Sequence, residues 1–197
     1  MPEHDRQSAS LHPAGRRLFE RALLRGTFTL RSGQTSDRYF DKYRVSCDPV
    51  LLALVADELA TLVAEHAPEA RRIVAPALGA VPLAAALALR TGLPFAIVRE
   101  TGKEYGTANR IEGPVEPGET ALLIEDVVTS GGAALDALAV AREAGLVVTH
   151  TFCVLDRDSG GREALADADA PLIALLGVDD LDAAFDAGVG IDVGAAS

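Results

Sequence analysis

Residues 122–132 read Leu-Leu-Ile-Glu-Asp-Val-Val-Thr-Ser-Gly-Gly, and this stretch determines how the whole chain is interpreted. It begins as an apolar run typical of a buried strand, and that run ends in two adjacent acids, Glu125 and Asp126. Two β-branched residues then lead into a turn rich in hydroxyl groups and glycine, after which a helical pattern begins. A strand, a glycine-rich turn and a helix in this order are typical of an α/β fold.

Short apolar runs and helical patterns follow one another along most of the chain after residue 70. In chain order, these runs and helical stretches cover 73–75, 81–90, 95–98, 121–124, 131–144, 147–155, 162–168, 172–176 and 178–187. Strands that alternate with helices predict a parallel sheet with helices on both faces. In such sheets, ligands bind beyond the carboxyl ends of the strands.

The N-terminal part of the chain has a different pattern. Apolar residues at helical spacing predict a helix over 13–25, and the residues that follow favour a hairpin with strands at 27–30 and 38–45. An aspartate–proline pair at 48–49 predicts the capped start of the next helix. We expect the segment from about 11–45 to form a small hood over the sheet.

The composition limits the class of protein. With 197 residues, 49% of them hydrophobic, the chain predicts one packed domain over 1–197, with a disordered segment at 1–10. Its formal net charge of −11 argues against a nucleic-acid partner, which normally requires a basic face. No stretch reaches the ~18–20 consecutive apolar residues of a membrane helix, so we expect no membrane partner. Cys47 and Cys153 stand far apart, as expected for reduced thiols of a cytoplasmic protein.

The turn at 129–133 carries the strongest chemical signal. Backbone N–H groups at the start of a helix attract anions, so the turn predicts a phosphate site. Gly131 and Gly132 permit close approach of a ligand to the backbone, and the hydroxyl groups of Thr129 and Ser130 add donors. The turn is neither a P-loop nor a Gly-x-Gly-x-x-Gly dinucleotide turn, because the required lysine and glycine spacing are missing.

Two carboxylates beside a phosphate site need an explanation, because like charges repel each other. Glu125 and Asp126 would suit ribose hydroxyl groups, a hydrated Mg²⁺ ion or a positive charge that develops during a reaction. The plainer alternative is a polar strand end followed by an ordinary capped helix start. These residues alone leave both interpretations open.

Four motifs together resemble a known family. Residues 122–132 closely resemble the phosphoribosyl pyrophosphate (PRPP) signature of the type I phosphoribosyltransferases, and the other three are similar to motifs of the orotate phosphoribosyltransferase family. These three are Phe28-Thr29-Leu30-Arg31-Ser32-Gly33 with the pair Tyr39-Phe40, a loop at 99–113 containing Lys103, Tyr105 and Ile111-Glu112-Gly113, and the pair Asp156-Arg157. The match covers roughly 18–165 in the right order.

The resemblance implies a type I phosphoribosyltransferase-like fold and a reaction in which orotate and PRPP give orotidine 5′-monophosphate and pyrophosphate. It implies catalytic roles for Lys103, Asp126 and Glu125. It implies that PRPP is bound by Arg99, Lys103, Tyr105, Glu125, Asp126, Val127, Val128, Thr129, Ser130, Gly131, Gly132 and Ala133. It implies that orotate is bound by Arg31, Tyr39, Phe40, Thr129 and Arg157.

The resemblance also implies a cofactor and an assembly. Mg²⁺ is expected as a cofactor held mainly through PRPP, with no direct protein ligand. A homodimer is expected in which the loop at 99–113 is shared across the interface, so that Lys103 and Tyr105 serve the other subunit's site. The turn at 75–80 matches the family's pyrophosphate-side loop.

Four departures from the family pattern lower the local positive charge. Together they do so because Glu100 replaces a basic residue and Gly79 replaces a cation present in some members. Arg31 replaces a lysine and keeps the charge but not the geometry, and Tyr105 replaces a frequent histidine and keeps a hydroxyl donor. They predict weaker donor binding or a changed acceptor, and two alternatives follow. One is a phosphoribosyltransferase for another base, which would not need a carboxylate clamp such as Arg157. The other is a non-catalytic PRPP-sensing regulator of the same fold.

Overall fold

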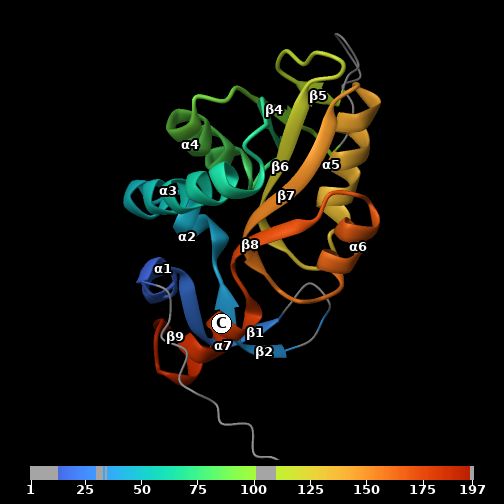
Figure 1. Cartoon of the computed structure of the whole chain (residues 1–197). Helices are drawn as coiled ribbons and strands as arrows, with labels where there is room; N and C mark the ends of the chain where they lie inside the picture. Colours follow the sequence, from blue (N-terminus) through green and yellow to red (C-terminus); the bar gives the residue numbers. More distant parts are fainter. Residues whose placement is uncertain (1–12, 30–32, 34, 101–109, 196–197) are drawn as a thin grey trace, which may run out of the picture.

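A computed structural model describes residues 13–29, 33, 35–100 and 110–195. Its centre is a six-stranded sheet with the order β5-β4-β3-β6-β7-β8 (Figure 1). All neighbouring strands are parallel except β5, which runs antiparallel to β4. The strands are β3 (Arg72–Pro76), β4 (Phe95–Val98), β5 (Ile111–Glu112), β6 (Thr120–Val128), β7 (Val147–Asp156) and β8 (Leu172–Leu176). The predicted parallel sheet with flanking helices is confirmed.

Helices cover both faces of this sheet (Figure 1). On one face, α3 (Pro49–His66) and α4 (Val81–Thr91) bury apolar side chains such as Leu59 and Leu87 against Ile124 of β6. On the other face lie α5 (Gly132–Glu143) and α6 (Gly161–Asp167), which pack against Leu123 of β6. The central strands are therefore apolar on both sides, as the continuous hydrophobic run at 121–124 predicts.

The start of α3 follows the predicted cap. The side chain of Asp48 accepts hydrogen bonds from the backbone N–H groups of Val50 and Leu51, at 2.8 and 3.2 Å. Pro49 occupies the first turn, where a backbone N–H would have no intrahelical partner. Both local signals therefore agree with the observed helix boundary.

A small three-stranded sheet forms the hood, with the order β2-β1-β9. It contains β1 (Leu23–Thr29), β2 (Thr35–Phe40) and β9 (Ile191–Ala195). Three helices accompany it: α1 (Pro13–Ala22), α2 (Lys42–Ser46) and α7 (Val178–Asp186). The predicted boundary of the hood at about 11–45 is therefore wrong in one respect, because β9 comes from the far end of the chain and pairs parallel to β1.

Two further boundaries in the hood differ from the sequence prediction. The helix predicted over 13–25 ends at Ala22, and Leu23 already belongs to β1, whose pairing with strands on both sides overrides the helical pattern. The second hairpin strand ends at Phe40 rather than continuing to Val45. Asp41 there caps α2 by accepting a hydrogen bond from the backbone N–H of Tyr43 at 3.1 Å. The expected disorder of 1–10 lies outside the described residues.

None of the helices in the described ranges combines the length and the apolar character that crossing a bilayer requires.

Candidate active site

The two adjacent acids lie within β6 rather than at its end. The strand continues through Val128, because Val127 and Val128 still pair with Leu155 and Asp156 of β7. Glu125 and Asp126 are only 7% and 5% exposed, so their carboxyl groups have lost nearly all contact with bulk water. Burial of two such groups side by side is costly unless each is neutral or paired.

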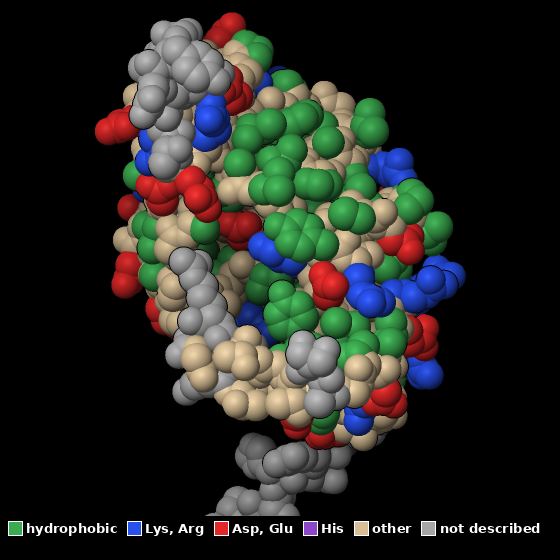
Figure 2. Space-filling view, turned by 180° about the vertical axis from the view of Figure 1, so that it is seen from behind, with side chains coloured by type: hydrophobic (Ala, Val, Ile, Leu, Met, Phe, Trp, Pro, Cys, Tyr) green, Lys and Arg blue, Asp and Glu red, His purple; other side chains and the backbone are tan. Residues whose placement is uncertain are grey.

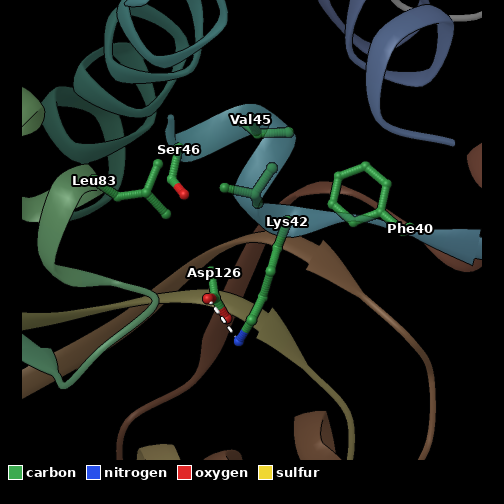
Figure 3. A pocket seen from close by; sticks show the side chains of 7 residues that line it. Phe40, Lys42, Val45, Ser46, Leu83 and Asp126 are labelled. Atoms are coloured by element: carbon green, nitrogen blue, oxygen red, sulfur yellow. Dashed lines mark ion pairs between the residues drawn. The ribbon is translucent and has the colours of Figure 1, made fainter. Parts of the chain in front are cut away.

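The carboxylate of Asp126 is paired with a lysine from the hood. Nζ of Lys42 lies 2.9 Å from Oδ2 of Asp126, and Oδ1 accepts a hydrogen bond from the N–H of Val127 at 2.7 Å. Figure 3 shows the Lys42 side chain reaching from the start of α2 to Asp126 on β6. Partial burial alone would lower the pKa of Lys42, but the hydrogen bond and charge of Asp126 outweigh it and raise that pKa. Lys42 therefore keeps its positive charge at neutral pH.

Glu125 is in the opposite state. Burial, followed by the charge of Asp126, raises the pKa of Glu125 to about 8. Its Oε1 accepts a hydrogen bond from the N–H of Asp126 at 3.1 Å, whereas Oε2 is buried and has no hydrogen-bond partner among the described residues. At neutral pH, Glu125 is thus mostly protonated and has a donor to offer. The two acids can therefore lie beside each other and near a phosphate, because Glu125 is neutral and Asp126 is paired with Lys42.

The turn after β6 presents its amides outward. The first N–H groups of a helix have no intrahelical partner, and those of 129–133 donate to no other group in the described part of the chain. Thr129 and Ser130 are exposed, and Gly131 adopts a left-handed conformation with φ of 77° at the N-cap of α5. Glycine is the residue that adopts this conformation without strain. Unpaired amides at a helix N-terminus are the geometry that an anion requires, and the phosphate site stays a prediction.

The segment after β7 lies beside this turn. The N–H of Arg157 donates to the carbonyl of Val128 at 2.8 Å, which fixes the backbone of Arg157 next to residues 129–133. We call these residues the phosphate turn. Asp156 is buried and accepts hydrogen bonds from Nε of Arg162 at 2.9 Å and from the N–H of Asp158 at 3.0 Å. Asp156 therefore anchors this segment, while Arg157 remains half-buried and has no side-chain hydrogen bond or ion pair within the described ranges.

A second hollow lies at the carboxyl ends of β3 and β4. Ala77, Leu78, Arg99 and Glu100 line it. Arg99 is held by an ion pair with Glu112 at 3.5 Å. The carboxylate of Glu100 is exposed and shares the hollow with the guanidinium of Arg99, which partly offsets the positive charge there.

The two ends of the loop at 99–113 are joined at this place. The N–H of Arg99 donates to the carbonyl of Arg110 at 2.8 Å, and Arg110 forms a two-pronged ion pair with Asp136 of α5. This pairing lowers the pKa of Asp136, so the pair stays charged over the working pH range. The base of the loop is thereby tied to the helix that begins at the phosphate turn.

The comparisons with known proteins agree with this geometry. The family model of the phosphoribosyl transferase domain matches residues 51–170. The orotate phosphoribosyltransferase of Halobacterium salinarum is 43% identical over 156 residues, which are 79% of this chain and 87% of that protein. The chain belongs to the orotate phosphoribosyltransferase family.

Solved structures of this family have the same fold. That of the Mycobacterium tuberculosis H37Rv orotate phosphoribosyltransferase in complex with Fe(III) dicitrate has a TM-score of 0.77 and 28% identity, covering 85% of this chain and 96% of that chain. The same enzyme in complex with PRPP gives a TM-score of 0.72 at 28% identity, covering 86% and 99%. The type I phosphoribosyltransferase-like fold expected from the motifs is therefore confirmed.

The structure brings many of the predicted site residues together. The phosphate turn, the two acids and the backbone of Arg157 lie on three neighbouring segments at the carboxyl ends of β6 and β7. Val127 and Val128 are strand residues within this arrangement. Other predicted residues, namely Arg31, Lys103 and Tyr105, lie outside the described residues.

The aromatic pair is divided between two environments. Phe40 is 6% exposed and packs edge-on against Phe19, with ring centroids 6.1 Å apart, and it also lines the pocket that contains Lys42 and Asp126. Tyr39 is half-exposed and stacks against Phe28 at 5.6 Å. Successive residues of a strand face opposite sides, so the pocket receives Phe40 but not Tyr39.

Sequence reasoning missed Lys42. The residue was assigned to a strand that in fact ends at Phe40, and a strand there gave no reason to place its side chain at β6. The available signal was Asp41, a favoured N-cap residue directly after an alternating strand pattern. Recognition of that cap would have started a helix at Lys42.

Proposed function

We infer that this protein catalyses the transfer of the phosphoribosyl group of PRPP to orotate, which gives orotidine 5′-monophosphate and pyrophosphate. The observation that carries this function is the outward-facing amide turn at 129–133, which follows a neutral Glu125 and an Asp126 paired with Lys42 on the same strand. This arrangement offers an anion site, a hydrogen-bond donor and a negative charge within one short segment. A phosphorylated sugar that becomes cationic during reaction requires all three.

The donor is bound through its 5′-phosphate at the turn. The amides of 129–133 and the hydroxyl groups of Thr129 and Ser130 surround the phosphate, which gains further from the dipole of α5. Glu125 donates its proton in a hydrogen bond to a ribose hydroxyl, because burial keeps it protonated. These contacts hold the sugar with its anomeric carbon near Asp126.

The chemical step breaks the bond between the anomeric carbon and the pyrophosphate oxygen and forms a bond to a ring nitrogen of orotate. As the first bond breaks, positive charge develops on the ribose and negative charge on pyrophosphate. The carboxylate of Asp126 stabilises the ribose cation, and Arg99 with Lys103 neutralises the leaving group. The ring nitrogen of orotate gives up its proton, which the pyrophosphate product or water takes up, so the products are orotidine 5′-monophosphate and pyrophosphate.

The acceptor is recognised through its carboxylate. Arg157 carries a planar guanidinium that is free of partners within the described residues and lies next to the phosphate turn. Arg31 and Thr129 add polar contacts with orotate, and Phe40 faces the orotate ring. Tyr39 contacts orotate from the outer side of the hood. A base without a carboxylate gains nothing from Arg157, so orotate is favoured over uracil and over purine bases.

One assay separates the candidate activities. The purified protein is incubated with PRPP and Mg²⁺, and orotate, uracil and adenine are offered in turn. Loss of orotate absorbance with release of pyrophosphate supports the proposal. Consumption of another base instead supports the alternative transferase, and tight PRPP binding without consumption of any base supports the regulator.

Mg²⁺ is proposed to arrive with the donor rather than to occupy a cage made by the protein. Within the described ranges, no three His, Cys, Asp or Glu side chains gather as a metal site. At the site itself, Glu125 is neutral and Asp126 is engaged by Lys42, so neither is a strong first ligand. Mg²⁺ commonly binds substrate phosphates and keeps several waters, and it would supply charge neutralisation on the diphosphate. Titration of PRPP turnover with Mg²⁺ against a chelator tests the requirement.

We also propose a homodimer in which Lys103 and Tyr105 serve the other subunit. Hydrophobic side chains gather on the face shown in Figure 2. Among the large hydrophobic residues described, Val50, Leu78 and Leu89 are 69–84% exposed, which a contact with a second copy would relieve. Sedimentation measures the assembly.

Mixed dimers test the shared loop. Lys103→Ala and Asp126→Asn proteins are inactive alone, and they are mixed after reversible dissociation. A loop that acts across the interface restores about a quarter of the sites, because half the dimers are mixed and each has one intact site. A loop that acts within its own subunit restores none.

We further propose a cytoplasmic location, supported by the free thiols Cys47 and Cys153, and a fluorescent fusion tests it.

A further inference from the structure

Lys42 is a charged residue at the centre of the site that no sequence motif introduced. It opens α2, at the junction between the hood and the central sheet, and its ammonium group lies 2.9 Å from Oδ2 of Asp126. Its side chain is 36% exposed, and it lines a pocket together with Phe40, Leu83 and Asp126. The Lys42 side chain therefore differs from an ordinary buried counter-ion.

The turn at 77–80 approaches the same ammonium group from the other side. A Cβ atom added to Gly79 would lie 3.0 Å from Nζ of Lys42 and 1.7 Å from Oδ2 of Asp126. No side chain fits at position 79 while this ion pair is in place. The carboxylate of Asp126, with the ammonium group of Lys42 beside it, thus occupies the space into which a residue at 79 would project its side chain.

The N–H groups of Leu78 and Gly79 in this turn donate to no other group in the described part of the chain. Gly79 lies beside the ammonium group, because a Cβ atom added there would be 3.0 Å from Nζ of Lys42. An ammonium group has three N–H donors, and the contact with Asp126 uses one of them. The others are available for an anion placed between Asp126 and the turn.

The charges of the site also indicate a role for Lys42 in binding the donor. With Glu125 protonated, the described centre contains one carboxylate, Asp126, and one ammonium group, Lys42, and its net charge is close to zero. Removal of Lys42 would leave a buried carboxylate facing the space where a highly charged donor must bind. Like-charge repulsion in a site of low dielectric constant is strong.

We propose that Lys42 binds the diphosphate group of PRPP and the pyrophosphate product. This inference rests on the proposed function, since it names a binding residue for the same donor. Lys42 keeps its contact with Asp126 and directs its other N–H groups to the diphosphate. The same ammonium group thereby joins the anion that leaves to the carboxylate that stabilises the ribose.

The experiment compares Lys42→Met with Lys42→Arg and with Arg44→Met as a matched control. Arg44 lies on the same short helix, and it pairs with Asp41 at 3.4 Å rather than with the site. For each protein, the dissociation constant of PRPP is measured by calorimetry in the presence of Mg²⁺. Inhibition by inorganic pyrophosphate, the KM for orotate and the melting temperature are measured as well.

Lys42→Met is expected to weaken PRPP binding and pyrophosphate inhibition about 10-fold or more, the loss typical of a hydrogen bond to a charged group. The KM for orotate stays within about twofold, and Lys42→Arg recovers part of the loss because it keeps the charge. Arg44→Met leaves all constants near those of the unmodified protein.

Two outcomes overturn the inference. If Lys42→Met lowers the melting temperature and leaves PRPP and pyrophosphate affinities unchanged, Lys42 only supports the fold. If the orotate KM rises as much as the PRPP dissociation constant, Lys42 is not specific for the diphosphate. Calorimetry tests this inference independently of the proposed function, because binding of PRPP is measured without any acceptor base. A protein that binds PRPP but consumes no orotate refutes the proposed function while the Lys42 comparison still stands.

Discussion

Gly161 packs against the carbonyl oxygen of Thr129 so closely that a Cβ atom on Gly161 would lie 2.4 Å from that oxygen. The start of α6 thus supports the phosphate turn from behind. The same Cβ would lie 2.5 Å from Cγ1 of Val128 and 3.0 Å from the backbone N of Gly131. The shape of the turn therefore depends on a residue from another segment of the chain.

Gly161→Ala is expected to displace the turn and to weaken PRPP binding about tenfold, while the KM for orotate changes much less. Overpacking of this kind typically costs about 1–3 kcal/mol of folding free energy, so the protein still folds. Calorimetry with PRPP and thermal unfolding measure both effects. Gly177→Ala is the matched control, because its new Cβ would meet only Oδ2 of Asp180, at 3.8 Å. Equal PRPP affinity in the two variants would argue against a supporting role of Gly161.

Gly79→Ala is expected to lower turnover at least tenfold. Its Cβ would lie 1.7 Å from Oδ2 of Asp126, so the carboxylate must move and the ion pair with Lys42 must break. The conformation of Gly79 is open to alanine, since its φ lies outside the left-handed region. The loss is therefore expected in kcat with the fold retained, as measured by steady-state kinetics and circular dichroism. Unchanged kcat would show that Asp126 can move without loss of function.

Glu125→Gln is expected to change the pH dependence of stability. The pKa of Glu125 is about 8 in the folded state and near 4.5 in the unfolded chain. The folded protein therefore retains a proton that the unfolded chain releases, and the free energy of unfolding falls as pH rises from about 4.5 to about 8. The glutamine variant lacks this contribution. The difference in melting temperature between the two proteins should grow over this pH window and become constant above it.

Turnover provides a second measurement on the same variant. Glutamine resembles the protonated carboxyl group, so Glu125→Gln should retain most activity near pH 7. Activity of the unmodified protein should decline above about pH 8, where Glu125 loses its proton, and the variant should decline less. Parallel pH profiles would contradict a role for the neutral acid.

Lys103→Ala is expected to lower turnover by orders of magnitude with almost no change in melting temperature. Lys103 lies outside the described residues, and its role follows from the family resemblance alone. A single cation that stabilises a departing anion typically lowers the activation barrier by several kcal/mol. Single-turnover kinetics with saturating PRPP measure the chemical step directly, and normal turnover would remove the catalytic role.

Asp126→Asn is expected to lower kcat about 100-fold or more, because the amide keeps the shape of the side chain but not its negative charge. The loss of charge also frees Lys42, so PRPP should bind at least as tightly as before. This split between kcat and binding distinguishes stabilisation of the ribose cation from a purely structural effect. A rate equal to that of the unmodified protein would rule out the assignment.

Local signals predicted the elements that local interactions form. The cap at Asp48, the turn after β6 and the alternation of apolar and helical stretches all act within a few residues, and each appears where the sequence places it. The phosphate turn and the acidic pair, the centre of the candidate site, lie within one such unit. Their chemistry could be inferred before any fold was known.

Long-range pairing explains what the sequence did not predict. β9 is a strand because it pairs with β1, which is remote in sequence. No periodicity within 191–195 predicts that pairing. The same limit concealed Lys42, whose role depends on the approach of the hood to β6. The protonation of Glu125 likewise follows from burial, a property of the assembled core.

The position of β1 between β2 and β9 affects the order of events during synthesis. β1 is translated before the central sheet, and its second neighbour, β9, is translated only after that sheet. The donor-binding half of the molecule can therefore assemble on the nascent chain while the hood still lacks a strand. Ribosome-bound chains that stop short of β9 should accordingly retain a protease-sensitive hood above an already protected sheet.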